Sequence, residues 1–255
     1  MKKEVLRRGA IISLSIILLI AALAAYILRP TVAPSGEIAA VPIEISSDIT
    51  SEIDLPTSTV EVTSVAELAE ELENDIAGPI IFEIQQSSSQ ASFTIDEILR
   101  GVNTTVVGVT NQVAAQILLD FIDPKASQIG LLQINARTLL TNSENRNRAI
   151  RNQILDVEDY EFISFEAVKL IGLPESIEIG ESYDIEIVGN LSIRHITNEV
   201  TFVATINIES MVQISGEAST TIQRGDYELI IPRVPSVAGV SEAVILEINF
   251  VAIAQ

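Results

Sequence analysis

The sequence contains no cysteine and only one histidine, His195, in 255 residues. The lack of cysteine excludes disulfide frameworks, thiolate zinc sites, cysteine nucleophiles and acylation of a lipoprotein thiol. A single histidine can supply at most one member of a catalytic triad or an HExxH-type metal site, although pairs of Asp and Glu remain available. Most enzyme chemistry is therefore disfavoured. We expect no catalytic residue, no metal ligand and no cofactor other than a bound lipid.

Basic residues are scarce outside the N-terminus. Beyond residue 29, 10 basic residues stand against 34 acidic ones, which gives this part a net charge of −24. The first 29 residues carry a net charge of +4, so the whole chain has a net charge of −20. A field of that sign repels nucleic acid and anionic lipid headgroups. We therefore expect no nucleic-acid partner, and a homodimer is the one protein assembly left open.

An uncharged, largely apolar run of 19 residues occupies positions 10–28. As a helix it would nearly span a hydrocarbon core of about 30 Å. Four basic residues precede it, which predicts a single-pass cell-membrane anchor with a cytoplasmic N-terminus and an extracytoplasmic remainder. The alternative is a signal peptide cleaved near Ala24, which would leave a secreted or periplasmic protein. The run is longer than a usual signal core, which favours the anchor.

Residues 30–78 contain four prolines and eleven acidic residues but no basic one. This composition predicts an extended linker between the segment 1–29 and a domain over 79–255. A capping-box pattern at Ser64 predicts a short helix to about Asn74, which either frays within the linker or docks on the following domain.

From residue 80 onward, apolar residues recur with a period of two, which is typical of antiparallel strands with one buried face. Eight or nine strands are expected, and one helix is expected over 143–153. The predicted strands lie at 91–95, 106–120, 129–137, 162–170, 183–188, 200–208, 211–218, 228–231 and 244–252. An all-β chain with short connections over this length predicts a closed barrel or a sandwich.

Five segments in the same order carry a resemblance to the YceI family of lipocalin-like secreted or periplasmic proteins. They are Ser89-Gln-Ala-Ser-Phe93-Thr-Ile95, the stretch 106–120 with Val106-Val-Gly108, Thr141-Asn-Ser-Glu-Asn-Arg146-Asn147, the stretch 154–165 with Asp156 and Tyr160, and the stretch 189–201 with Gly189-Asn-Leu191-Ser-Ile193. The chain is thereby identified as a member of that family over about two thirds of its length.

The resemblance implies an extended eight-stranded antiparallel barrel that holds a polyisoprenoid or similar long-chain lipid in an axial tunnel. An interior of eight strands either fills with side chains or holds one slender ligand, and the sequence leaves both open. Alternation predicts the following inward, ligand-binding positions: Ala91, Phe93, Ile95, Ile117, Leu119, Leu132, Ile134, Ile163, Phe165, Ile185, Ile187, Leu191, Ile193, Phe202, Leu246, Ile248 and Phe250.

The chain departs from the family at three positions where relatives carry histidine. Those positions are occupied by Glu97, Ala149 and Arg194. Any headgroup role of the histidines therefore does not transfer. His195 is shifted by one position onto the opposite strand face, which predicts an ordinary residue at a strand end.

Arg146, Arg148 and Arg151 share the predicted helix and could bind a lipid headgroup at the barrel mouth, with pairing to nearby carboxylates as the favoured alternative. An acidic turn at 156–159 lacks the spacing of a calcium loop.

The leading hypothesis is a membrane-tethered, extracytoplasmic lipid-binding domain. The alternatives are a structural or interaction protein with a solid core and, third, an enzyme that uses a pair of carboxylates.

Overall fold

The computed structural model of the chain describes residues 36–44 and 78–255. The expected membrane anchor at 10–28 and the expected helix at 64–74 lie outside the described residues. Within the described part, no helix is long and apolar enough to cross a membrane.

The described domain is built almost entirely of antiparallel strands. In chain order they are β1 (Ile80–Ile84), β2 (Gln90–Leu99), β3 (Val102–Thr110), β4 (Val113–Ala114), β5 (Gln116–Leu119), β6 (Gln128–Ile129), β7 (Leu132–Asn135), β8 (Phe162–Ile171), β9 (Ser182–Ile193), β10 (Ile196–Ser210), β11 (Gln213–Gln223), β12 (Val237–Val240) and β13 (Ala243–Ala254).

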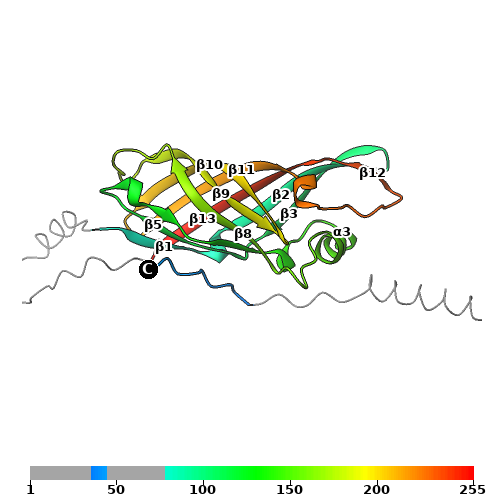
Figure 1. Cartoon of the computed structure of the whole chain (residues 1–255), viewed down its shortest axis with the longest axis horizontal. Helices are drawn as coiled ribbons and strands as arrows, with labels where there is room; N and C mark the ends of the chain where they lie inside the picture. Colours follow the sequence, from blue (N-terminus) through cyan, green and yellow to red (C-terminus); the bar gives the residue numbers. More distant parts are fainter. Residues whose placement is uncertain (1–35, 45–77) are drawn as a thin grey trace, which may run out of the picture.

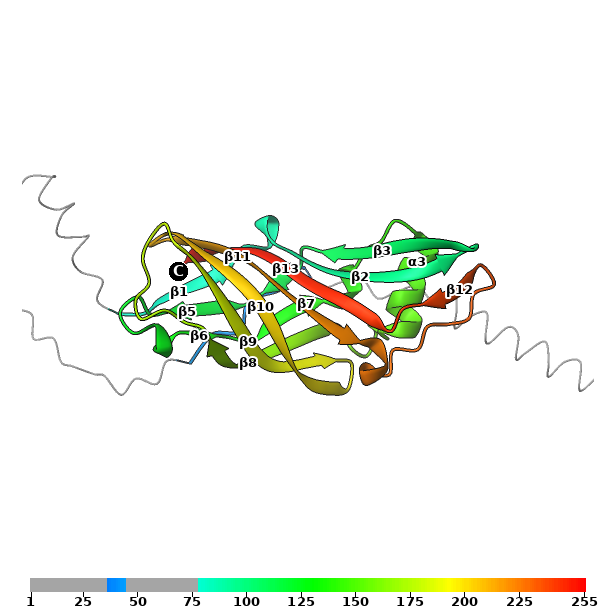
Figure 2. The same ribbon diagram turned by 90° about the horizontal axis from the view of Figure 1, so that it is seen from above.

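The strands curl into a closed ring. Strands β7 to β11 pair in sequence, β11 pairs with β13, β13 with β1, and β1 with β5. Strands β4 and β5 are separated only by Ala115 and form one interrupted strand. Since β5 pairs with β1 and β4 pairs with β7, this strand closes the ring. Strands β2, β3 and β12 extend one end of this barrel, with β2 paired to β13, β3 and β12 (Figures 1 and 2).

The main helical segment matches the expected one at 143–153. It starts as α3 (Glu144–Ala149) and continues as the π-helical turn η4 (Ile150–Ile154). Four short 3₁₀ turns lie in other connections, namely η1 (Gln86–Ser88), η2 (Pro124–Ala126), η3 (Ala136–Thr138) and η5 (Arg224–Tyr227).

Three strand predictions are corrected by the structure. The run 228–231 is not a strand, because Glu228 follows η5 with a φ of 50°, in the left-handed region, and the chain turns away from the sheet. The run 106–120 is divided into β3, β4 and β5 by breaks at 111–112 and at Ala115. The run 129–137 is likewise divided, and its end forms η3.

The first part of the expected linker that the structure describes packs against the barrel. The Gln86 side-chain amide donates to the carbonyl oxygen of Ile38 at 2.6 Å, and the Ile43 amide donates to Oε1 of Gln116 at 2.9 Å. The side chain of Ile38 is buried, and that of Ile43 lies over Gly130. Residues 36–44, blue in Figure 1, therefore form a strap along the outside of the sheet.

Candidate functional site

Three apolar cavities formed by the described residues follow one another inside the barrel. The wide chamber, about 160 Å³, lies between α3 and the β2–β3 end. A middle chamber of about 70 Å³ shares Phe93, Leu139 and Leu246 with it. A far chamber of about 60 Å³ shares Phe165 and Phe202 with the middle one and no residue with the wide one. The three spaces therefore follow one another along the barrel.

Nearly the whole wall of this row is hydrocarbon. The wide chamber is lined by Phe93, Ile95, Glu97, Val106, Leu139, Arg146, Ile150, Ile154, Leu155, Ile163, Ile193, Ile222, Arg224, Leu229, Ile231, Val240, Val244 and Leu246. Its only charged lining residues are Glu97, Arg146 and Arg224. The far chamber has no ionisable lining residue. The lining of the middle chamber includes one ionisable residue, Glu247, which is exposed. Three of the four charged lining residues therefore lie at the wide end of the row, as an amphipathic ligand requires.

Two phenylalanines separate the middle and far chambers. The rings of Phe165 on β8 and Phe202 on β10 meet edge to face, with centroids 5.0 Å apart and planes at 70°. Both rings line both chambers. This pair is the partition through which a long ligand would have to pass.

The structure places most of the predicted inward residues on these walls. Ala91, Phe93, Ile95, Ile117, Leu132, Ile134, Ile163, Phe165, Ile187, Leu191, Ile193, Phe202, Leu246, Ile248 and Phe250 line at least one chamber. Leu119 and Ile185 are buried in the core but border none of the three. Their expected contact with a ligand therefore has no support from the cavity walls.

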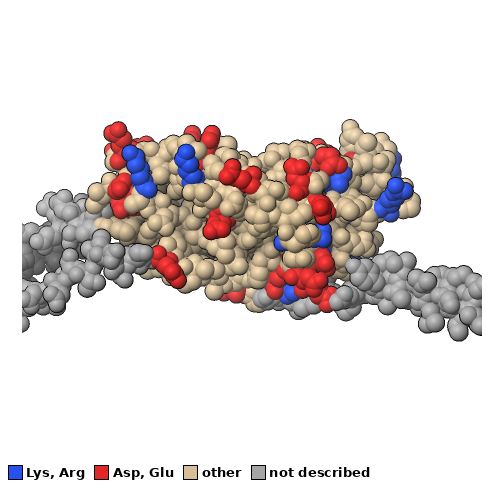
Figure 3. Space-filling model, in the orientation of Figure 1, with Lys and Arg blue, Asp and Glu red and all other residues tan. Residues whose placement is uncertain are grey.

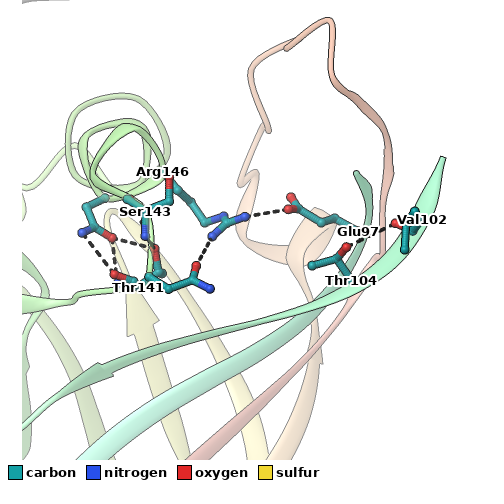
Figure 4. Close-up of polar contacts among 8 residues, drawn as sticks. Glu97, Val102, Thr104, Thr141, Ser143 and Arg146 are labelled. Atoms are coloured by element: carbon teal, nitrogen blue, oxygen red, sulfur yellow. Dashed lines mark hydrogen bonds and ion pairs between the residues drawn. The ribbon is translucent and has the colours of Figure 1, made fainter. Parts of the chain in front are cut away.

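The polar end of the wide chamber is organised by one ion pair. Nη2 of Arg146 on α3 lies 2.7 Å from Oε1 of Glu97 on β2 (Figure 4). The carboxylate side chain is only 9% exposed and the guanidinium 21%. Arg146 also donates through Nη1 to Oδ1 of Asn142 at 2.8 Å. The carboxylate pairing expected for this arginine is thus confirmed, and it occurs on the cavity wall.

The backbone before α3 holds Arg146 in place. Oδ1 of the buried Asn147 accepts from the Thr141 amide and hydroxyl, both at 2.7 Å, and the Ser143 amide donates to the Thr141 hydroxyl at 3.3 Å (Figure 4). Thr141, Arg146 and Asn147 belong to one of the segments singled out in the sequence. Thr141 and Asn147 stabilise the start of the helix, and Arg146 reaches the chamber.

The other arginines of the helix do not reach the cavity. Arg148 is exposed, and Nη1 of Arg151 points to the carbonyl oxygen of Arg137 at 3.5 Å. Neither lines a chamber, so the structure does not place them at the headgroup position expected from the sequence. Of the three arginines, only Arg146 extends from the helix toward β2.

Several apolar wall residues, such as Ile222 and Val244, and two charged wall residues were not among the predicted site residues. Glu97 had been noted only as a lost histidine position, although it continues the inward alternation of positions 91, 93 and 95. Arg224 gave no sequence signal. It donates to the carbonyl oxygens of Ser241 and Leu229, both at 3.1 Å, and pairs with Glu242.

His195 lies in the turn between β9 and β10, as expected for a strand-end residue. Its Nε2 is 3.9 Å from Oε2 of Glu228, and both side chains are exposed. The acidic stretch 156–159 forms a turn in which the amides of Asp159 and Tyr160 donate to the carbonyl oxygen of Asp156. Within residues 36–44 and 78–255, no group of three or more metal-ligating side chains comes together.

Comparison with known proteins assigns this architecture to a family. The model of the YceI-like domain matches residues 82–252, which is more than half of the chain. No curated protein sequence matches the chain significantly.

Solved structures share the fold at low sequence identity. A polyisoprenoid-binding domain from Saccharophagus degradans, implicated in plant cell wall breakdown, is 13% identical with a TM-score of 0.55, and the match covers 69% of this chain and 99% of that one. BcnA of Burkholderia cenocepacia is 15% identical with a TM-score of 0.53, and the match covers 66% of this chain and 98% of that one. Each of these solved chains is matched over almost its whole length and so consists of little more than this barrel.

Proposed function

Because this chain belongs to the YceI family, we propose that it binds a long-chain apolar lipid, of the polyisoprenoid class, in the row of chambers inside its barrel. The observation that carries the proposal is the continuity of apolar walls through three successive cavities, with three of the four charged lining residues at the wide end. The polyisoprenoid binding of the Saccharophagus degradans domain supports the same ligand class.

The driving force for such binding is the removal of hydrocarbon from water, worth about 25 cal/mol per Å². An apolar cavity of about 150 Å³ stays dry and accepts a molecule the size of benzene. The wide chamber is of that size and accepts the head end of a ligand. The two smaller chambers accept its chain once the Phe165 and Phe202 rings rotate.

The solid-core alternative is disfavoured by the same cavities, since protein interiors seldom leave voids larger than a water molecule. The enzymatic alternative needs two facing carboxylates. Glu97 is the only carboxylate on the wall of the wide chamber, and it is paired with Arg146. We therefore propose binding without catalysis.

Thermal unfolding tests the proposal, because a ligand that binds only the folded state stabilises it by about 2.7 kcal/mol at one hundred times its dissociation constant. The fragment 30–255, freed of lipid, is melted with a long-chain prenol and with a five-carbon prenol in detergent at matched concentration. We expect the long prenol alone to raise the melting temperature. No change with any long-chain prenol, fatty acid or quinone would contradict lipid binding.

We further propose that residues 10–28 anchor the protein in the membrane and that the barrel lies outside the cytoplasm. The uncharged run and its basic flank support this orientation. Retention in the membrane after carbonate washing, with protease access from the outer side, is the expected result. A soluble mature chain that begins near Ala25 would establish cleavage instead.

A further inference from the structure

One end of the barrel carries a surface unlike the rest of the molecule. It consists of the β2–β3 turn at residues 99–103 and the loop at residues 230–237, and we call it the basic tip. The two parts are joined by the pairing of Leu99 with Val237 and by the Arg100 amide, which donates to the carbonyl oxygen of Ser236 at 2.7 Å. Figures 1 and 2 show this end, at β12, projecting beyond α3.

The basic tip exposes large apolar side chains. Val102 is 64% exposed, Ile230 75% and Val234 44%. Exposed apolar residues also occur elsewhere, and some of them have carboxylates as close sequence neighbours. Ile122 lies between Asp120 and Asp123, and Ile179 lies between Glu178 and Glu181. Exposure alone therefore does not distinguish the tip, and its charge must be considered.

The charge of the basic tip is opposite to that of the chain. The stretches 98–106 and 229–241 contain Arg100 and Arg233, both exposed, and no acidic residue, although the chain has a net charge of −20. Figure 3 shows basic side chains standing apart from acidic ones at this end. The carboxylates that border the two stretches, among them Asp96, Glu97 and Glu242, lie outside the tip itself. Because salt screens charges over about 8–10 Å, the two arginines rather than the net charge of the chain govern the attraction of headgroups to the tip.

The basic tip is also part of the wall of the wide chamber. Leu229 and Ile231 line the chamber, whereas Ile230 between them faces solvent. Val240, at the end of β12 and three residues beyond the tip, lines the chamber as well. A single loop therefore separates the chamber from whatever the tip contacts.

We propose that the basic tip docks on a lipid bilayer that carries anionic headgroups, with Val102, Ile230 and Val234 inserted at the boundary of headgroups and acyl chains. Protruding apolar side chains flanked by arginine are the elements that peripheral proteins use at this boundary. Charge complementarity selects the bilayer, because Arg100 and Arg233 attract anionic lipids while the acidic sides of the barrel keep the protein from lying flat on them. Docking places the wide chamber at the membrane surface, where a lipid can enter or leave it. The docking itself does not rest on the proposed ligand.

The absence of tryptophan from the chain gives a direct test. Ile230→Trp places a single reporter on the tip at a position that is 75% exposed. Val212→Trp places one at a position that is 61% exposed, beside the end of the C-terminal strand at the opposite end of the barrel. The fragment 30–255 is mixed with vesicles of equal parts phosphatidylcholine and phosphatidylglycerol. We expect a blue shift of emission for Ile230→Trp and none for Val212→Trp. No shift at position 230, or equal shifts at both positions, would overturn the proposal.

Sedimentation with the same vesicles tests the charge. Reversal of the tip with Arg100→Glu and Arg233→Glu should reduce the vesicle-bound fraction at low salt at least about tenfold. The control, Lys125→Glu with Lys169→Glu, makes the same change in net charge at exposed positions outside the tip. Equal losses in the two double variants would show a response to net charge alone and would contradict a docking role for the tip. Vesicle binding by a protein whose melting temperature no long-chain lipid raises would support the tip while contradicting the proposed function.

Discussion

Phe93 and Gly108 face each other across the β2–β3 ladder, and the ring of Phe93 occupies the space where a side chain on Gly108 would begin. The same relationship recurs where Phe250 faces Gly216 on β11, and the ring of Phe165 lies over Gly189 on β9. Each glycine lets a ring lie against the barrel wall. The three rings belong to chamber walls, so the glycines keep the row of cavities open.

The first prediction concerns that role. Gly108→Ala should push the Phe93 ring into the wide and middle chambers and weaken binding of a long prenol by about tenfold, while Gly239→Ala, whose new methyl meets only Ile98 at 3.8 Å, should not. Prenol titration of both variants measures the effect. Similar affinities of the two variants for the prenol would contradict the proposal that Gly108 keeps the chambers open by leaving room for the Phe93 ring.

A second prediction concerns the ion pair on the chamber wall. Arg146→Met leaves the carboxylate of Glu97 buried without its partner and should lower the free energy of unfolding by about 2–4 kcal/mol. The double variant with Glu97→Leu should recover most of the loss, because no unpaired charge then remains. Urea unfolding of the wild type, the two single variants and the double variant gives the coupling energy. A double variant as unstable as Arg146→Met would show that packing, rather than charge, is at stake.

A third prediction follows from Tyr227, which is almost fully buried and whose hydroxyl meets no hydrogen-bond partner among the described residues. Burial raises the pKa of this phenol and the charge of Asp226 adds to the shift. The polar side chain of Asn198, which lies near the hydroxyl without forming a well-oriented hydrogen bond to it, opposes the shift in the pKa. Tyr227→Phe should raise the free energy of unfolding by about 1 kcal/mol at neutral pH.

The same residue should make stability depend on alkaline pH. The unfolded chain loses the phenolic proton at about pH 10, below the pKa of the folded state, so stability falls as pH rises above that value. Urea unfolding at several pH values should show this component in the wild type and not in Tyr227→Phe. Parallel curves for the two proteins would mean that the phenol titrates alike in both states.

The fourth prediction concerns the strap at residues 36–44. Ile38→Ser exposes a buried contact and should lower the free energy of unfolding of the fragment 30–255 by about 1–2 kcal/mol. Val41→Ser, at a position already 42% exposed, is the matched control and should have almost no effect. Equal stability in the two variants would indicate that the strap does not hold to the barrel in solution.

Alternation made much of the barrel readable from the sequence. Phe93 and Ile95 recur every second residue on one strand, and the helix around Arg146 interrupts the strand period clearly. The run at 228–231 was misread because Leu229 and Ile231 alternate like a strand, although they line the chamber from a loop that starts at the left-handed Glu228.

Contacts between distant segments could not be read in this way. Glu97 and Arg146 are 49 residues apart, and only the closure of α3 over β2 brings their charges together. The contact between Ile38 and Gln86 likewise depends on the position of the barrel surface relative to residues 36–44. The composition of a linker does not predict that position. The opposite charge of the basic tip arises because two stretches more than a hundred residues apart meet through β2 and β12.

The central claim is that the row of chambers holds one long-chain lipid, and native mass spectrometry of the barrel released from its own cells by proteolysis of the linker tests it most directly. We predict one added mass per barrel, of the polyisoprenoid class, that disappears on denaturation and is reduced in Gly108→Ala. A spectrum of the bare polypeptide alone, from protein never exposed to detergent, would contradict the claim.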